Sequence, residues 1–294
     1  MVRPVLLAGR VLAAPERISM PPLIHPTAVI SAEATLADDI RVGPFALLEG
    51  PVTFGPGCVI GPHTHLSGPL VVGRDNTFGA GSVVGGPPQH LAYRGELTAV
   101  VIGDGNSLRE HVTVHRGMPI GVGPGTGETR IGNGNLFMVG SHVGHDCRIG
   151  NHGVYANSTL LGGHVETGDR VLCSGNSAAH QFCRIGRLAL LSGVSACSKD
   201  IPPFWIIRDV NRVCGVNVIG MRRAGIPQAE ILAVRRAFKI ICLDRLTVPH
   251  ALTRIEAEID DFPAIRELVT FIRGSKRGIC GPGDFHPSGE AAAA

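Results

Sequence analysis

Large apolar residues recur at every sixth position over most of this chain. All ten positions reached in steps of six from Ile30 to Val84 are apolar, and the step resumes at Ile102 and at Ile131, from which it continues with smaller residues to Cys197. A spacing of six matches neither the 3.6-residue period of a helix nor the two-residue alternation of a strand. It is typical of a coil in which three short segments, about 18 residues, complete one triangular turn.

The composition agrees with a fold built largely of turns. The chain has 40 glycines and 21 prolines but only 4% aromatic residues. Glycine, Asn and Asp follow the apolar positions, as in Val42-Gly43 and Ile131-Gly132-Asn133, because tight corners need residues that tolerate positive φ. We therefore predict a mainly β fold, a parallel β-helix. Periodicity does not determine its hand, and the general rule for parallel crossovers favours a right-handed one.

The pattern also predicts the domain organisation. Residues 85–101 and 115–130 leave the period and are expected to form loops, which commonly carry function. After residue 200 the signals become helical, and we predict helices at 217–224, 227–244, from 247, and 263–273. The expected domains are a dispensable extension (1–22), a catalytic β-helix (23–203), a helical domain (204–280) and a disordered tail (281–294).

Charge and cysteine content exclude several classes of function. The 27 basic and 24 acidic residues give a net charge of +3, too small and scattered for a nucleic-acid-binding surface. The eight cysteines form neither a C-x-x-C pair nor a compact secreted framework, so we expect reduced thiols in a cytoplasmic protein. Arg10 divides the first apolar residues into pieces too short for a signal peptide, and no later stretch is long enough to span a membrane.

Histidines between residues 142 and 180 are the candidate reactive groups. His145 and Gly163 are 18 residues apart, so they occupy equivalent places on adjacent turns, and the N–H of Gly163 can face whatever His145 contacts. His142, His164 and His180 are expected to gather on the same edge. A base for a hydroxyl, a donor for an oxyanion and polar groups for an acceptor are the requirements of acyl transfer.

Two other interpretations of these histidines exist. Histidines can simply occupy solvent-facing corners of a β-helix, and we interpret His152 in this way. Zinc bound by three histidines is known from a β-helix carbonic anhydrase, but its ligand spacing differs. We therefore expect no metal.

Six segments resemble one enzyme family, in order and at nearly the same spacing. They are HPTAVI from residue 25, IGDGNSLREHVTVHRG from 102, SHVGHDCRIGN from 141, GGHV from 162, AHQFCRIG from 179 and DIPPF from 200. Together they resemble the acyltransferases that place a 3-hydroxyacyl chain on UDP-N-acetylglucosamine in the first step of lipid A biosynthesis. The resemblance covers about residues 23–280. It implies a left-handed parallel β-helix of hexapeptide repeats, a small C-terminal α-helical domain and a homotrimer.

The resemblance also implies roles for individual residues. His145 would be the general base for the sugar 3-hydroxyl, the N–H of Gly163 would stabilise the oxyanion, and Asp146 would polarise His145. That last pairing needs a corner, because adjacent strand residues point apart. Gly193 matches the position that sets acyl-chain length and implies a long chain. The other implied substrate-binding residues are Gln89, His90, His115, His142, His164, His180, Gln181, Asn217 and Arg223.

The implied acyl donor is acyl carrier protein, which brings its own phosphopantetheine, so no further cofactor is expected. This acidic partner requires a basic docking surface. Arg235, Arg236 and Lys239 match the family's docking helix, with Arg235 and Lys239 on one face. An exposed, Arg-rich helix face is also an ordinary feature without a partner.

Departures from the family pattern concern acceptor recognition. Where the family has P-Q-D-x-K, this chain has Pro88-Gln89-His90-Leu91-Ala92, and Ile219 and Ala224 replace an acid and an Arg. His90 could accept one hydrogen bond, including one from an amine on the sugar. The leading hypothesis is therefore the family's O-acyl transfer, and the second is the same transfer to a different amino-sugar nucleotide or other acceptor. A third is a catalytically silent hexapeptide binding protein, which the intact His145 and Gly163 motifs argue against.

Overall fold

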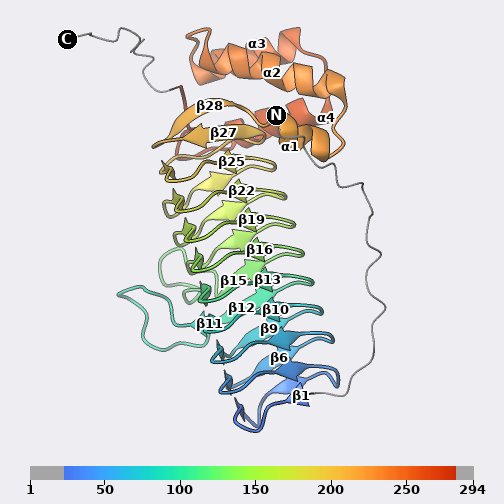
Figure 1. The fold of residues 1–294 in the computed structure, drawn as a ribbon. Coiled ribbons are helices and arrows are strands. Elements are labelled where there is room, and N and C mark those ends of the chain that lie inside the picture. Colours follow the sequence, from blue (N-terminus) through green and yellow to red (C-terminus); the bar gives the residue numbers. More distant parts are fainter. Residues whose placement is uncertain (1–22, 283–294) are drawn as a thin grey trace, which may run out of the picture.

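The computed structural model describes residues 23–282, so the predicted extension 1–22 and nearly all of the predicted tail lie outside the described residues. The described chain forms a long prism of stacked coils, with the helices gathered at the end opposite β1 (Figure 1). Each coil contributes one short strand to each of three sheets.

Strands of the same sheet are three elements apart in the chain. Sheet A contains β1 (Leu23–Ile24), β4 (Arg41–Val42), β7 (Val59–Ile60), β10 (Thr77–Phe78), β13 (Ser107–Leu108), β16 (Leu136–Phe137), β19 (Val154–Tyr155), β22 (Leu172–Cys173), β25 (Leu190–Leu191), β27 (Trp205–Arg208) and β28 (Arg212–Val216). Sheet B contains β2 (Val29–Ile30), β5 (Leu47–Glu49), β8 (His65–Ser67), β11 (Val83–Gly86), β14 (Thr113–His115), β17 (His142–Val143), β20 (Leu160–Leu161), β23 (Ala178–Ala179) and β26 (Ala196–Cys197). Sheet C contains β3 (Thr35–Leu36), β6 (Val52–Phe54), β9 (Leu70–Val72), β12 (Ala99–Ile102), β15 (Glu128–Ile131), β18 (Arg148–Ile149), β21 (Glu166–Thr167) and β24 (Arg184–Ile185).

The strand register confirms the predicted turn of 18 residues. His142 pairs with Leu160, which pairs with Ala178, and all neighbours in sheets B and C are parallel. The six-residue positions are the second residues of these strands, where they point into the prism. Those from Val42 to Cys197 are buried, whereas Ile30 and Leu36, near the open end of the prism, are partly buried.

The corners of the prism hold residues in the left-handed backbone region. Over the middle coils every sixth residue has a φ between 55° and 66°, and the set is Asp146, His152, Ser158, His164, Arg170, Asn176, Phe182, Leu188 and Val194. Such a φ is unfavourable for residues other than Gly, Asn or Asp. The hydrogen bonds between coils hold these corners in place, and they turn Asp146 and His164 to the same edge.

Two loops leave the prism, as predicted, but with shorter extents. The first loop is residues 87–98, between β11 and β12, and the second loop is residues 116–127, between β14 and β15. Figure 1 shows the first loop extending away from the coils beside β11. Both loops begin at the end of a sheet B strand and return to sheet C, so both lie at the corner between those sheets.

The helical part agrees with prediction except at its start. Helices α1 (Val218–Arg223), α2 (Gln228–Cys242), α3 (Val248–Glu258) and α4 (Pro263–Arg273) form where capping and proline signals placed them. The expectation that helices follow residue 203 directly was wrong, because β27 still pairs with β25 and folds back on β28 as a hairpin. The expected tail also began too early, because the carbonyl of Gly281 accepts from Val213 N at 2.9 Å.

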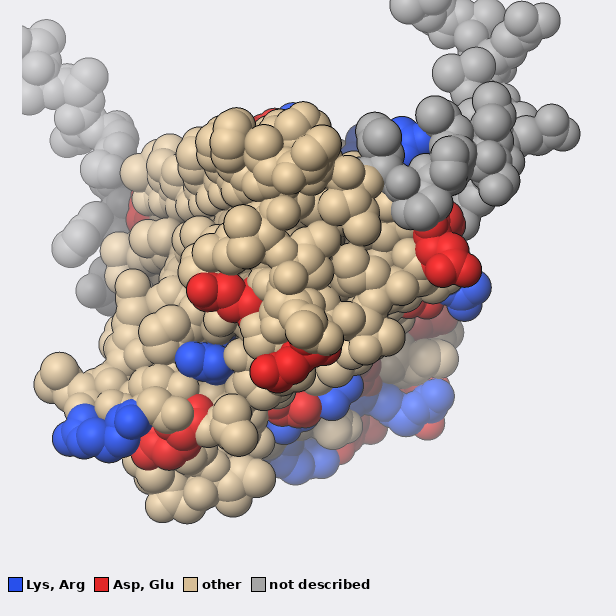
Figure 2. Space-filling model, turned by 90° about the horizontal axis from the view of Figure 1, so that it is seen from below, with Lys and Arg blue, Asp and Glu red and all other residues tan. Residues whose placement is uncertain are grey.

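The surface at the β1 end carries few charges. Figure 2 shows mostly uncharged residues on this face, with basic and acidic residues near one another. Such a mixture does not make the continuous basic surface that a nucleic acid requires. Among the described residues, no helix is long and apolar enough to cross a membrane.

Candidate active site

His145 and Asp146 form a hydrogen-bonded pair at the corner after β17. His145 Nδ1 lies 2.7 Å from Asp146 Oδ2, and the side chains are 11% and 0% exposed. The left-handed φ of Asp146 lets two consecutive side chains meet, which an extended strand would prevent. Because a carboxylate only accepts, Nδ1 carries the proton and Nε2 of the neutral ring keeps its lone pair. The expected pairing and the corner it needs are both present.

The Asp146 carboxylate is held by donors from the second loop. Oδ2 accepts from the N–H of Met118 at 2.9 Å, and Oδ1 accepts from the N–H and hydroxyl of Thr126 at 2.6 and 2.8 Å. Burial alone would raise the pKa of Asp146, but the hydrogen bonds from His145, Thr126 and Met118 outweigh it and lower the pKa to about 2. Asp146 is therefore a permanent carboxylate near neutral pH.

Gly163 lies one coil beyond His145, as the 18-residue spacing predicted. A β-carbon at Gly163 would fall 2.7 Å from Nε2 of His145, so only glycine leaves room for the ring. Within the described part of the chain, the N–H of Gly163 donates to neither a carbonyl nor a side chain. A base nitrogen and an unengaged donor therefore lie side by side.

Two further histidines contact His145. The ring centroids of His164 and His90 lie 5.1 and 5.6 Å from that of His145, both edge to face, and Phe182 stacks on His164. Burial lowers the pKa of His164, partly offset by the charge of Asp146. His90 Nδ1 accepts from the N–H of Ala92 at 3.1 Å, so the neutral ring carries its proton on Nε2. The expectation that His90 acts as an acceptor is therefore wrong, because its free nitrogen is a donor.

His115 and His142 form a second pair along the same edge. Their ring centroids are 4.9 Å apart, and His142 Nδ1 lies 2.7 Å from the hydroxyl of Thr113. Burial, together with the neighbouring imidazoles of His142 and His145, lowers the pKa of His115 to about 4. Burial also lowers the pKa of His142. These rings are neutral near pH 7 and line the site as uncharged hydrogen-bonding groups.

Not all predicted residues join this group. His180, on the coil after His164, has Nδ1 within 3.1 Å of the carbonyl of Gln181 and 3.4 Å of Arg277. The four imidazoles expected to gather are therefore three, with His180 engaged beside the helical part. Gln89 is exposed on the first loop.

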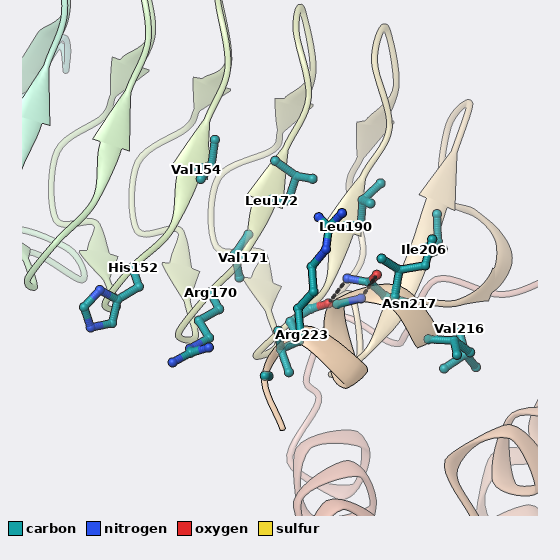
Figure 3. Close-up of a pocket in the computed structure, with 15 residues that line it drawn as sticks. His152, Val154, Arg170, Val171, Leu172, Leu190, Ile206, Val216, Asn217 and Arg223 are labelled. Carbon is teal, nitrogen blue, oxygen red and sulfur yellow. Dashed lines mark hydrogen bonds between the residues drawn. The ribbon is translucent and has the colours of Figure 1, made fainter. Parts of the chain in front are cut away.

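Asn217 and Arg223 lie at a different edge of the prism. They line a pocket of about 660 Å³ between α1 and the outer face of sheet A, whose apolar wall includes Leu172, Leu190 and Ile219. In Figure 3, Arg223 projects from α1 across the strands, and Asn217 is fixed by hydrogen bonds to the carbonyl of Leu188 and the N–H of Gly220.

Two residues of this pocket were missed from the sequence. His152, interpreted as a solvent-facing corner residue, and Arg170 both line the pocket from the corner between sheets C and A. Their spacing of 18 residues was the signal that could have joined them. Gly193 lies at the third corner, between sheets A and B, and a β-carbon there would meet only Gly175 O at 3.4 Å and Ser174 Cβ at 3.9 Å.

The three predicted docking cations are exposed on α2, but they are not equivalent. Arg236 pairs with Glu258 at 2.9 Å. Arg235 and Lys239 form no ion pair with the described residues, so they are the two available positive charges on this helix face.

One cluster has the composition of a metal site. Ligand atoms of His145, Asp146 and His164 lie within 4.8 Å of one another. The carboxylate is already engaged, however, because Oδ1 accepts from two groups of Thr126 and Oδ2 from His145 and Met118. The cluster is therefore better suited to orienting His145 than to coordinating an ion.

Comparison with known proteins connects this geometry to one family. A family profile described as "Udp N-acetylglucosamine O-acyltransferase; Domain 2" matches residues 200–280. The acyl-(acyl-carrier-protein)–UDP-N-acetylglucosamine O-acyltransferase of Anaeromyxobacter sp. strain K is 46% identical over 257 residues, covering 87% of this chain and 98% of that protein.

Solved structures give the same result. The Francisella novicida UDP-N-acetylglucosamine acyltransferase superposes with a TM-score of 0.84 at 31% identity, covering 89% of this chain and 95% of that one. The enzyme of Bacteroides fragilis has a TM-score of 0.82 at 37% identity, with coverages of 87% and 99%. The expected fold, a left-handed parallel β-helix with a small C-terminal helical part, is confirmed.

Proposed function

The chain belongs to the UDP-N-acetylglucosamine O-acyltransferase family, and from this premise we propose that His145 is the general base that transfers a 3-hydroxyacyl chain from acyl carrier protein to the sugar 3-hydroxyl. One observation supports this role above the others. The Nδ1 proton of His145 is directed at Asp146, which leaves the Nε2 lone pair beside the N–H of Gly163.

The proposed step balances with groups of the chain. Nε2 of His145 takes the proton of the acceptor hydroxyl while its oxygen attacks the thioester carbonyl, whose developing negative charge is stabilised by the N–H of Gly163. The carbon–sulfur bond then breaks and phosphopantetheine leaves as a thiolate. Because a thiolate is a weak base, its departure needs no strong acid, and the imidazolium can return its proton afterwards.

No metal or resident cofactor takes part in this proposal. The base needs only the carboxylate of Asp146, whose oxygens are occupied by protein donors. Turnover should be unchanged after dialysis against a chelator. A loss of activity that Zn²⁺ restores would instead assign the His145, Asp146 and His164 cluster to a metal.

The homotrimer is supported by the separation of the two candidate regions. His145 lies at the corner between sheets B and C, whereas the pocket of Asn217 and Arg223 lies at the corner between sheets C and A. A neighbouring copy can bring the two corners together. Apolar residues on both loops, Leu91 and Ile120, are 97% and 81% exposed and would be covered by such contacts.

A mixing experiment tests this arrangement. His145→Ala and Arg223→Ala chains, each nearly inactive alone, should regain part of the activity when unfolded and refolded together, because some interfaces then contain an intact copy of each residue. Absence of complementation, with an active monomer in sedimentation, would contradict the shared site.

The proposed donor surface comprises Arg235 and Lys239 on α2. Arg235→Ala should raise KM for acyl carrier protein more than Arg236→Ala, because Glu258 already neutralises Arg236. Equal effects of the two substitutions would remove this assignment. We also place the reaction in the cytoplasm, a proposal supported by eight cysteines that are all free thiols.

The deciding assay supplies 3-hydroxyacyl carrier proteins with a panel of sugar nucleotides. UDP-N-acetylglucosamine should be acylated, and His145→Ala should lower turnover by roughly 10²- to 10⁴-fold without loss of the fold. Near-normal turnover of His145→Ala would remove the residue from the mechanism. A different preferred acceptor is a second candidate, favoured by the donor character of His90 and by the apolar Ile219 in the pocket under α1.

A further inference from the structure

Thr126 makes more contacts with the Asp146 carboxylate than any other residue of the second loop. Its N–H lies 2.6 Å and its hydroxyl 2.8 Å from the same oxygen, Oδ1. The hydroxyl also lies 2.8 Å from the carbonyl of Glu128, but it has one proton to donate. A carboxylate is the stronger acceptor, so the hydroxyl proton belongs on Asp146.

The second loop is closed at its base around this carboxylate. Gly127 N donates to the carbonyl of Met118 at 2.8 Å, and the N–H groups of Met118 and Thr126 point to the two oxygens of Asp146. Met118 is buried, with 2% of its surface exposed, whereas Ile120 between them in the chain is 81% exposed. The base of the loop is therefore part of the catalytic corner, and its outer part is free to contact another molecule.

We propose that Thr126 is a positioning residue for catalysis, which holds Asp146 so that the carboxylate keeps the Nδ1 proton of His145 and directs Nε2 at the acceptor. This inference rests on the proposed function. A carboxylate held only by the backbone donors could rotate about its bond to the chain and share its charge less evenly. The side chain of Thr126 makes the oxygen that faces away from His145 the better satisfied one.

The consequence is a defined effect on the basicity of His145. Removing the hydroxyl leaves more of the negative charge on Asp146 for His145, so the imidazolium is stabilised and more base is protonated at a given pH. The other titratable groups around the pair are unchanged by the substitution, and they are His90, His115, His142, His164 and the buried thiol of Cys147.

The experiment compares three variants of the full-length protein. Thr126→Val keeps the shape and the N–H but removes the hydroxyl. We expect kcat to fall on the order of 10-fold, KM for both substrates to change little, and the acid limb of the pH profile to move to higher pH. Thr126→Ser should restore both kcat and the profile.

Thr129→Val is the matched control. The hydroxyl of Thr129 accepts from the backbone N–H of Asp146 at 2.8 Å and does not reach its carboxylate. This variant should lower the melting temperature without moving the acid limb. Thermal unfolding of all variants separates a loss of fold from a loss of positioning.

The possible results separate the inference from the proposed function. Thr126→Val with the kcat and pH profile of the unmodified protein, alongside an inactive His145→Ala, overturns the role of Thr126 alone. A Thr126→Ser protein as impaired as Thr126→Val, with no shift in the profile, also overturns it, because shape would then matter instead of the hydroxyl. Normal turnover of His145→Ala overturns the proposed base, whatever Thr126 does.

Discussion

The ring of His145 occupies the space that a side chain at Gly163 would fill, since a β-carbon built there lies 2.7 Å from its Nε2 and Cε1 atoms. Gly163→Ala should therefore displace the base while keeping the backbone N–H. A misplacement of about 1 Å can cost on the order of 10²-fold in rate, so we expect a loss of roughly 10- to 100-fold in kcat. Steady-state kinetics measure it.

Gly215→Ala is the control for that substitution, because a β-carbon at Gly215 meets nothing within 4 Å. It should leave kcat unchanged. If Gly163→Ala also retained the unmodified kcat, the close approach of the two residues would have no catalytic meaning.

His90→Asp should improve the use of UDP-N-acetylglucosamine. His90 presents a donor on Nε2, whereas an aspartate would present an acceptor to a sugar hydroxyl. A charge-assisted hydrogen bond contributes about 1.5 to 3 kcal/mol, so KM should fall about 10-fold or more. His90→Gln, which adds no charge, should change KM less. Efficient use of the sugar nucleotide by the unmodified protein, impaired in His90→Asp, would show that His90 is adapted to the ordinary acceptor.

Gly193→Met should shift donor preference to shorter acyl chains. A β-carbon at Gly193 makes only ordinary contacts, at 3.4 Å and beyond, so the backbone tolerates a side chain there. A methionine then fills space that a long chain would need, whereas Gly193→Ala adds one methyl group and should keep the preference. Competition between acyl carrier proteins with different chain lengths measures the ratio. An unchanged ratio in Gly193→Met would separate this residue from chain-length selection.

Stability should fall as the pH drops from about 6.5 to 4, partly because of His115. Its pKa is lowered to about 4 in the folded protein, chiefly by burial, from a usual value of 6.5. Between these values the unfolded chain binds a proton that the folded protein does not, so the free energy of unfolding rises with pH in this window.

Each such group can contribute at most about 1.4 kcal/mol per pH unit. His115→Gln should therefore show a shallower loss of stability than the unmodified protein, measured by denaturant unfolding at several pH values. Identical slopes would indicate that His115 is protonated in the folded state.

Much of the architecture was predictable because a β-helix is governed by local repetition. Each coil needs one inward apolar residue every six positions, and a residue such as Leu66 or Val143 meets this requirement whatever lies elsewhere in the chain. The pairing of His145 with Gly163 followed from the same arithmetic, since equivalent positions on adjacent coils must be neighbours. The hairpin of β27 and β28 was missed because it obeys no repeat and depends on pairing with β25.

The sequence by itself determined the prism, the edge that carries His145, Gly163 and His164, and the family to which the chain belongs, because all three are written in evenly spaced residues. Only the tertiary structure decided how those residues are used. The second loop folds back so that Thr126 and Met118 satisfy Asp146, the N–H of Ala92 sets the tautomer of His90, and Asn217 and Arg223 face a different edge from His145. These contacts join segments with no fixed spacing, so they arise from the three-dimensional path of the loops and of α1.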